Sequence, residues 1–346
     1  MSDPLRIPVI DISPLLEEGA GPAAAAETIE QVRAATQQVG FMYISGHSVP
    51  TDLMDRMKDI SRRFFKLPLA EKQRISMLEG GKAWRGFFKV GDELTSGVAD
   101  QKEGIYFGSE LPAEHPLPLH GPNLWPSGEL GAEMKEIVLD YIARMQQLGE
   151  RCFILMQAVA SSLNINPMFF GEAFADPTIL FRIFNYPPHN PEYGQTSQAV
   201  GEHTDYGYLT ILWQDSSGGL QVRGRAGQWI DAPYVENTFV INLGDALEHC
   251  TGGLLRATPH RVLQRAGAIG DRLSFPFFYD PNFKADMTSI VSLLTPEQRE
   301  VAEANRFDRW DKSDPSSFQG SYGAYLTTKV SKVFPGLAAA SITSNS

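Results

Sequence analysis

The spacing of apolar residues along the first part of the chain alternates between two patterns. An apolar run at 7–12 predicts a short strand, and the apolar positions of 24–40 recur at the spacing of one helix face. A second apolar run at 40–47 predicts another strand. The helix expected over 52–68 ends at Pro68, whose ring cannot continue a helix. The pattern therefore predicts strands and helices in alternation at the start.

The rest of the chain reads as one long helix followed by many short strands. A single apolar stripe predicts a helix over about 129–163 that backs a sheet. Later apolar runs, separated by Gly, Asp and Pro turns, lie at 179–187, 210–214, 219–223, 228–232, 238–244, 254–263 and 272–280. Helices are expected again between 296 and 333. This pattern predicts a mainly β fold with flanking helices around a two-sheet jelly roll, the double-stranded β-helix.

We divide the chain into four regions on this basis. They are an N-terminal region at 1–125, the backing helix at 126–175, the jelly-roll core at 176–285 and C-terminal helices at 286–346. Within the first region, a Pro- and His-rich segment at 111–126 is either a cover over a functional site or a surface crossover.

Composition narrows the class of partner. The 346 residues carry a net charge of −11, whereas nucleic acids and anionic membranes attract clustered Lys and Arg. No apolar run reaches the roughly 18 residues of a membrane span. Cys152 and Cys250 are too few for a disulfide framework and are expected in the core. We expect a cytoplasmic enzyme with a small-molecule substrate, binding neither nucleic acid nor membrane, and of open oligomeric state.

An H-x-D triplet supplies a candidate metal site. His203, Thr204 and Asp205 lie in a stretch that reads as a strand, so His203 and Asp205 would project to the same side. His260 would arrive from another strand and complete two imidazoles and one carboxylate, the ligand set of non-haem Fe(II) oxygenases. Short patterns of this kind also occur in solvated turns, and His249 is a competing candidate ligand.

Arg272 and Ser274 strengthen the metal interpretation. They share one face of an apolar, strand-like run. A guanidinium pairs bidentately with a carboxylate, and a hydroxyl two residues away adds a donor. The two side chains are therefore expected to bind an anionic co-substrate.

These segments resemble the 2-oxoglutarate and Fe(II)-dependent dioxygenases of the isopenicillin N synthase-like group. The resemblance is carried by IPVIDISPL, VGFMYISGHSVP, RGFF, HTDYGYLTIL, GGLQVR, FVINLGDALEHCTGGLLRATPHRV, RLSFPFFYDPNF and YGAYLTTKVSKVFPG, in the family's usual order. It implies that His203, Asp205 and His260 are the catalytic Fe(II) ligands and that Arg272 and Ser274 bind 2-oxoglutarate. The implied reaction uses dioxygen to oxidise, most simply to hydroxylate, a substrate C–H bond. Succinate and carbon dioxide are released, and ascorbate can reactivate the iron.

The resemblance is weaker at the co-substrate strand and the substrate pocket. Relatives carry an NYYPP-like segment, whereas this chain has FNYPP, so Asn185 either contacts 2-oxoglutarate or is satisfied by backbone. Residues expected on the substrate side, with core packing as the alternative for the aromatic ones, are Arg85, Phe87, Tyr106 and Phe184. Arg85 would bind a substrate carboxylate, or else form a salt bridge to Asp92 or Glu103.

Other chemistries remain open from sequence. Isopenicillin N synthase keeps the R-x-S pair without using 2-oxoglutarate, and ethylene-forming oxidases use the co-substrate differently. From another class, the same three ligands could serve a zinc hydrolase or a non-redox metal-binding protein. A hydrolase needs a general base, and Glu202, by alternation, should point away from the metal.

Overall fold

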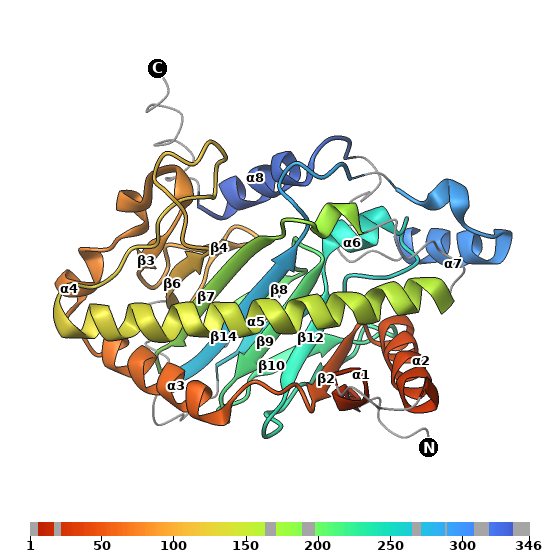
Figure 1. Cartoon of the computed structure of the whole chain (residues 1–346), viewed down its shortest axis with the longest axis horizontal. Helices are drawn as coiled ribbons and strands as arrows, with labels where there is room; N and C mark the ends of the chain where they lie inside the picture. Colours follow the sequence, from red (N-terminus) through yellow and green to blue (C-terminus); the bar gives the residue numbers. More distant parts are fainter. Residues whose placement is uncertain are drawn as a thin grey trace.

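The computed structural model describes residues 6–16, 22–162, 171–188, 198–264, 271–287, 289–307 and 318–334. Within these residues, two facing sheets and their flanking helices form the fold, as expected from the strand pattern (Figure 1). The 8-stranded sheet has the order β1 (Val9–Asp11), β2 (Phe41–Ser45), β12 (Phe239–Leu243), β9 (Leu209–Gln214), β14 (Arg272–Asp280), β7 (Thr178–Tyr186), β6 (Glu103–Gly108) and β3 (Gly86–Phe88). Except for the parallel pair β1–β2, neighbouring strands are antiparallel.

The second sheet is smaller and carries part of the candidate site. Its order is β11 (Trp229–Asp231), β10 (Leu220–Arg223), β13 (His260–Leu263) and β8 (Gln198–His203), all antiparallel. A separate hairpin joins β4 (Leu94–Thr95) and β5 (Val98–Ala99).

Helices cover the large sheet and its ends. They are α1 (Ser13–Leu16), α2 (Pro22–Gln38), α3 (Thr51–Phe65), α4 (Leu69–Gln73), α5 (Gly128–Ser162), α6 (Asp245–Cys250), α7 (Pro296–Phe307) and α8 (Tyr322–Val333). Short 3-10 turns lie at Met77–Ala83, Glu172–Phe174 and Val291–Leu293. None of the helices described here combines the length and the apolar character needed to cross a bilayer.

The long helix α5 backs the sheet, as the apolar stripe predicts. It crosses the face of the large sheet that is turned toward the viewer in Figure 1. Its buried Tyr141 ring lies 4.9 Å from that of Phe181 on β7. Gly149 lets the helix approach β14 closely, because a Cβ there would lie 2.5 Å from the Tyr279 ring. The face of the sheet away from α5 is left for the smaller sheet and the site.

The sequence pattern does not predict β3 and β6 of the large sheet or β4 and β5 of the hairpin. β6 pairs with β7 and with β3, yet the sequence around both shows no clean alternation. All six residues of β6 are buried, and strands buried on both faces lack the polar–apolar period of two. Because β1, β2, β3 and β6 join core strands in one sheet, the large sheet is continuous across the predicted boundary at 125. The four-region division stays a prediction.

Two strand boundaries also differ from the expected ones. β8 ends at His203, so Thr204 and Asp205 lie beyond the strand. The strand expected over 254–263 begins only at His260, because the short helix α6 and a turn with left-handed Gly252 and Gly253 precede it. Both corrections place metal-ligand candidates at strand ends, where side chains reach beyond the sheet.

Candidate functional site

The face of the large sheet opposite α5 and the smaller sheet enclose a cavity of about 380 Å³. This volume is typical of small-molecule sites. Seven of the residues predicted from sequence line it: His203, Asp205, His260, Arg272, Ser274, Tyr106 and Phe184. The structure therefore brings the candidate metal ligands, the candidate co-substrate residues and two of the candidate substrate residues into one space.

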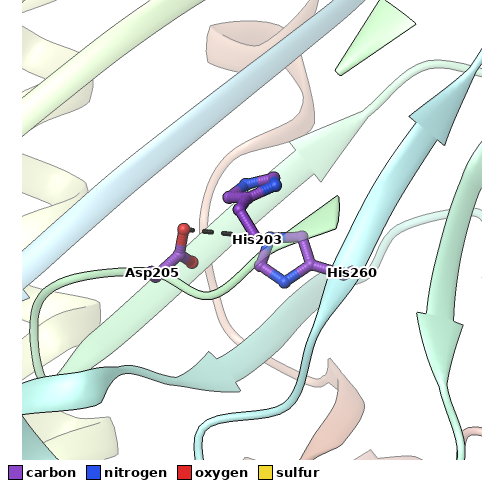
Figure 2. Close-up of side chains that lie close together, drawn as sticks. All are labelled: His203, Asp205 and His260. Carbon is purple, nitrogen blue, oxygen red and sulfur yellow. Dashed lines mark ion pairs between the residues drawn. The ribbon is translucent and has the colours of Figure 1, made fainter. Parts of the chain in front are cut away.

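The three candidate metal ligands converge at the ends of two neighbouring strands (Figure 2). His203 and His260 are register partners on β8 and β13, and their ring centroids lie 4.2 Å apart. Asp205 follows β8 directly, and its Oδ1 lies 3.8 Å from Nε2 of His260. One ligand atom from each residue lies within 4.8 Å of the other two. A single ion could bind all three, which is the facial arrangement expected from the triplet.

The hydrogen bonds of His203 and His260 involve Nδ1 and leave Nε2 free to bind a metal. Nδ1 of His203 lies 2.8 Å from the Gly201 carbonyl oxygen, and Nδ1 of His260 lies 3.2 Å from that of Thr258. A proton on Nδ1 that is donated to a carbonyl leaves the lone pair of Nε2 for a metal. The residues present thus fit a metal ion bound through both Nε2 atoms.

The carboxylate is oriented in the same manner. Oδ2 of Asp205 accepts hydrogen bonds from Thr210 Oγ1 at 2.6 Å and from Asn242 Nδ2 at 2.7 Å. Thr210 and Asn242 are direct partners across β9 and β12. Oδ1 therefore remains for the metal. Sequence reasoning missed both partners, although each is a polar residue in a mostly apolar strand, and that is the signal that could have found them.

Burial and charge favour the protonation states that a metal requires. Burial works against the charge of Asp205, but His260 and His203 and the hydrogen bonds from Asn242 and Thr210 outweigh it and hold the pKa of this carboxyl below its usual value. Burial and the neighbouring His203 lower the pKa of His260 to about 4, against the opposing effect of Asp205. Burial also lowers the pKa of His203. The cluster is thus an anionic carboxylate between two neutral imidazoles.

Replacement of Asn242 by leucine is expected to weaken Fe(II) affinity by roughly 10–100-fold, the usual cost of losing an outer partner of a metal ligand. The buried Asn185 of β7 offers a matched control, because it hydrogen bonds Glu103 and Asp271 away from the cavity. Anaerobic calorimetric titration with Fe(II) measures both variants. Equal affinities in Asn242→Leu and Asn185→Leu would show that Asn242 does not orient Asp205.

Iron binding is expected to resist mild acid, because a lowered pKa keeps an imidazole neutral to a lower pH. Two ordinary imidazoles that titrate near pH 6.5 would lose affinity about 100-fold between pH 7.5 and 5.5. The pKa of His260 is lowered to about 4, and that of His203 is also lowered. We therefore expect Fe(II) affinity to fall less than roughly tenfold over this interval and to fall steeply only as the pH approaches 4. Calorimetric titration at each pH tests this, and a hundredfold loss by pH 5.5 would contradict it.

Arg272 also lines the cavity and has one hydrogen-bond donor without a partner. Its Nε donates to the Gly218 carbonyl at 2.7 Å, and Nη2 donates to Gln214 at 3.1 Å. Nη1 is buried and has no hydrogen-bond partner. The guanidinium also lies over the Tyr186 ring, 4.6 Å from its centroid. A fixed cation with an unused buried donor fits the distal carboxylate of 2-oxoglutarate. Ser274 lines the same cavity, two residues along the strand.

The structure does not bring three of the predicted residues to the cavity. Asn185 pairs with Leu273, between the cavity-lining Phe184 and Tyr186, and alternation turns its side chain to the opposite face. Arg85 is buried and donates to the Leu119 carbonyl at 2.9 Å, with neither Asp92 nor Glu103 as its partner. Phe87 packs against Phe64, with ring centroids 6.0 Å apart.

Two other candidates from the sequence also lie away from the cavity. The side chain of His249 is buried, and its Nε2 lies 2.9 Å from the Met287 carbonyl oxygen, outside the three-ligand cluster. The segment at 111–126 contributes no lining residue. The hairpin of β4 and β5 and the helix α8 provide lining residues instead.

Sequence reasoning also missed a buried group of charges in the cavity wall. Lys102 Nζ forms ion pairs with Glu93 Oε2 at 3.0 Å and with Asp100. Arg182 on β7 lies nearby and lines the cavity. Both Lys102 and Glu93 come from segments without clean periodicity, so their burial carried no signal in the sequence.

Comparisons with known proteins show the family of the chain. A family model described as "non-haem dioxygenase in morphine synthesis N-terminal" matches residues 7–128, and one described as "2OG-Fe(II) oxygenase superfamily" matches residues 177–281. The chain is 43% identical to a Dictyostelium discoideum protein named "Probable iron/ascorbate oxidoreductase", covering 96% of each chain. It is 32% identical to the 1-aminocyclopropane-1-carboxylate oxidase of Dictyostelium mucoroides, covering 95% of each.

A solved structure gives the same result for the fold. A full-length Neurospora crassa protein in complex with alpha-KG and thymine superposes with a TM-score of 0.75 at 27% identity, covering 96% of this chain and 98% of that one. The predicted jelly roll is therefore confirmed. From the identities and coverage of its relatives, the chain belongs to the 2OG-Fe(II) oxygenase superfamily and is an oxidoreductase.

Proposed function

We propose that this protein hydroxylates a C–H bond of a small molecule, with Fe(II) bound by His203, Asp205 and His260 and with 2-oxoglutarate bound by Arg272 and Ser274. The observation that carries the proposal is the pairing, in one cavity, of a three-ligand cluster and an enclosed cation with an unused donor. The net reaction takes one oxygen atom of O₂ into the substrate and the other into succinate, with release of carbon dioxide.

When bound, the iron and 2-oxoglutarate supply the oxidising chemistry, and the protein supplies position and electrostatics. His203 and His260 offer neutral Nε2 lone pairs, while Asp205 offers one anionic oxygen. Arg272 neutralises the distal carboxylate of 2-oxoglutarate and so fixes the direction of the keto acid toward the cluster. The aromatic and aliphatic side chains of the cavity wall keep bulk water away from the reacting carbon.

The alternatives receive less support. In a zinc hydrolase, Glu202 would be the nearby base, but its carboxylate is 2.7 Å from Arg223 Nη1 and is not among the cavity-lining residues. An oxidase that dispenses with 2-oxoglutarate would leave Nη1 of Arg272 without an acceptor. The finer placement in the isopenicillin N synthase-like group is part of the proposal and is supported by the order of the matching segments.

We also infer that the substrate is small and that the protein works in a reducing compartment. A cavity of about 380 Å³ has to hold 2-oxoglutarate and the substrate together, so the substrate is small. The Neurospora crassa protein, whose solved complex contains thymine, provides a related example.

Cys152 and Cys250 are unpaired and buried, which suits a reducing compartment such as the cytoplasm, where iron stays ferrous.

Anaerobic reconstitution tests the proposed function. Adding 2-oxoglutarate to the Fe(II)-loaded protein should produce a weak visible charge-transfer band, and the Zn(II)-loaded protein is the matched blank. Admission of air should remove the band and form succinate. A protein that binds Fe(II) but develops no band would exclude chelation of the keto acid, and an oxidase driven by ascorbate would then replace the proposal.

A further inference from the structure

Arg182 lines the cavity and makes no hydrogen bond to another described residue. Its side chain is 15% exposed and lines the cavity, while its Nε is buried without a partner. The nearest carboxylate oxygen, Oε1 of Glu93, is 3.8 Å from Nη1, which is too far for a hydrogen bond. A guanidinium carries five N–H donors, and leaving them unsatisfied in a buried place costs free energy.

The guanidinium is fixed in position although it lacks hydrogen bonds. Its central carbon lies 4.1 Å from the ring centroid of Tyr106 and 4.7 Å from that of Phe278. The Tyr106 hydroxyl is in turn held by Glu93, to which it donates at 2.7 Å. Burial works against the charge, but Tyr106 and Glu93 outweigh it and raise the pKa of Arg182. Arg182 is thus a preorganised cation in the cavity wall.

The other buried or half-buried cations of the cavity wall already have partners. Lys102 is paired with Glu93 and Asp100, and Lys329 of α8 lies 3.2 Å from Oδ2 of Asp245. Arg272 is the residue that we assign to the co-substrate. Among the described lining residues, this leaves Arg182 as the largely buried cation that has only a long ion pair, 3.8 Å to Glu93, and neither a hydrogen bond nor an assigned ligand.

Arg182 and Arg272 lie at different positions along the cavity wall. The cavity face of β7 carries Tyr186 opposite Arg272, then Phe184 opposite Ser274, then Arg182. Arg182 lies four positions before Tyr186 on the strand, a rise of about 13 Å. Asp205 is among the charges that act on Arg182, so the metal cluster lies within electrostatic reach of it. The two arginines therefore occupy separate positions, with Arg272 at the co-substrate end and Arg182 further along the wall.

We propose that Arg182 binds the carboxylate of the organic substrate, and that the substrate class is small carboxylic acids whose apolar part packs on the neighbouring aromatic wall. A carboxylate satisfies two guanidinium donors at once and matches the charge, whereas a neutral amide or ester offers no anion to hydrogen bond the guanidinium. Phe184 and Phe334 supply this wall beside Tyr106, with ring centroids 6.3 and 5.6 Å from that of Tyr106. This inference rests on the proposed function, since it concerns the substrate of the same site.

The test compares acids with their own primary amides. The full-length protein, loaded anaerobically with Fe(II) and 2-oxoglutarate, is titrated calorimetrically with phenylacetate, 3-phenylpropanoate and hexanoate and with the three corresponding amides. We expect at least one acid to bind the wild type ten times more tightly than its amide. Arg182→Met should bind the acid no more tightly than the amide. Arg182→Lys should retain part of the preference for the acid.

Two control variants separate this role from general charge or folding. Lys332→Met removes an exposed lysine of the cavity rim, and Arg85→Met removes a buried arginine outside the cavity; both should keep the preference for acids. Arg182→Met should also keep the charge-transfer band of bound 2-oxoglutarate. Absence of the charge-transfer band in the wild type would refute the proposed function but not the role of Arg182. Absence of acid binding, equal affinity for acids and amides, or a preference that survives in Arg182→Met would overturn the role of Arg182.

Discussion

Replacement of Asp205 by alanine is expected to abolish 2-oxoglutarate turnover and to reduce Fe(II) affinity far beyond the roughly 10–100-fold that an outer partner contributes. The carboxylate is the one anionic member of the three-ligand cluster, and its Oδ1 is the atom left free for the ion. Without it, two neutral imidazoles face a dication with no charge compensation. His203→Ala and His260→Ala should have the same effect, because each removes one of the three ligand atoms.

A matched control is available for the histidine variants. His249 is also buried but lies outside the cluster, where it contacts the Met287 carbonyl. His249→Gln should retain iron binding and turnover, whereas His260→Gln should lose both. Succinate formation and anaerobic Fe(II) titration, together with thermal unfolding of each variant, distinguish loss of the site from loss of the fold. Turnover retained in any of the three ligand variants would refute the site assignment.

The jelly-roll architecture could be predicted because most of its strands are short, apolar and bounded by turn residues. The same reasoning failed for β6 and β3, which are buried throughout and therefore show no alternation. It also failed at the start of β13, since a Gly-Gly turn shortens that strand, and apolar residues before His260 pack without forming a ladder. Strand length depends on pairing with neighbours, which a local pattern does not contain.

The site shows the same division between local and long-range information. His203, Asp205 and Arg272 could be singled out from sequence as candidates, because each pair, His203 with Asp205 and Arg272 with Ser274, shows its chemistry within three residues. Asn185 illustrates the limit, since the face that it occupies follows from its pairing with Leu273 rather than from its own neighbours. Once Arg272 faces the cavity, the register requires Tyr186 and Phe184 to face it as well.

The same register explains why the sequence pattern does not indicate Arg182 as a cavity residue. An arginine within an apolar strand reads as an exposed edge residue or as one member of a salt bridge. In the structure, it shares the cavity face of β7 with Phe184 and Tyr186 and lacks a hydrogen-bonded partner. Both cavity arginines, Arg182 and Arg272, thus combine burial, stacking on an aromatic ring and an unsatisfied donor. This combination depends on tertiary structure and is invisible in a sequence pattern.

Replacement of Arg272 by leucine is expected to raise the KM for 2-oxoglutarate on the order of 100-fold while leaving Fe(II) affinity unchanged. Removing one partner of a buried, hydrogen-bonded charge pair costs roughly 2–5 kcal/mol, and each 1.4 kcal/mol is about tenfold in affinity. Iron binding should be spared because the three-ligand cluster is formed by β8, β13 and the residues after β8, and not by β14.

Two further variants test whether Arg272 binds the co-substrate or only supports the fold. Arg272→Lys keeps the charge but loses the planar fork, so its KM should lie between those of the wild type and Arg272→Leu. Gln214→Leu removes a neighbour that accepts from Nη2, while leaving Nη1 and the charge in place, and should change KM far less. Steady-state kinetics in 2-oxoglutarate decide the question. If KM is unchanged in Arg272→Leu while thermal stability falls, Arg272 is structural, and the co-substrate must be bound elsewhere in the cavity.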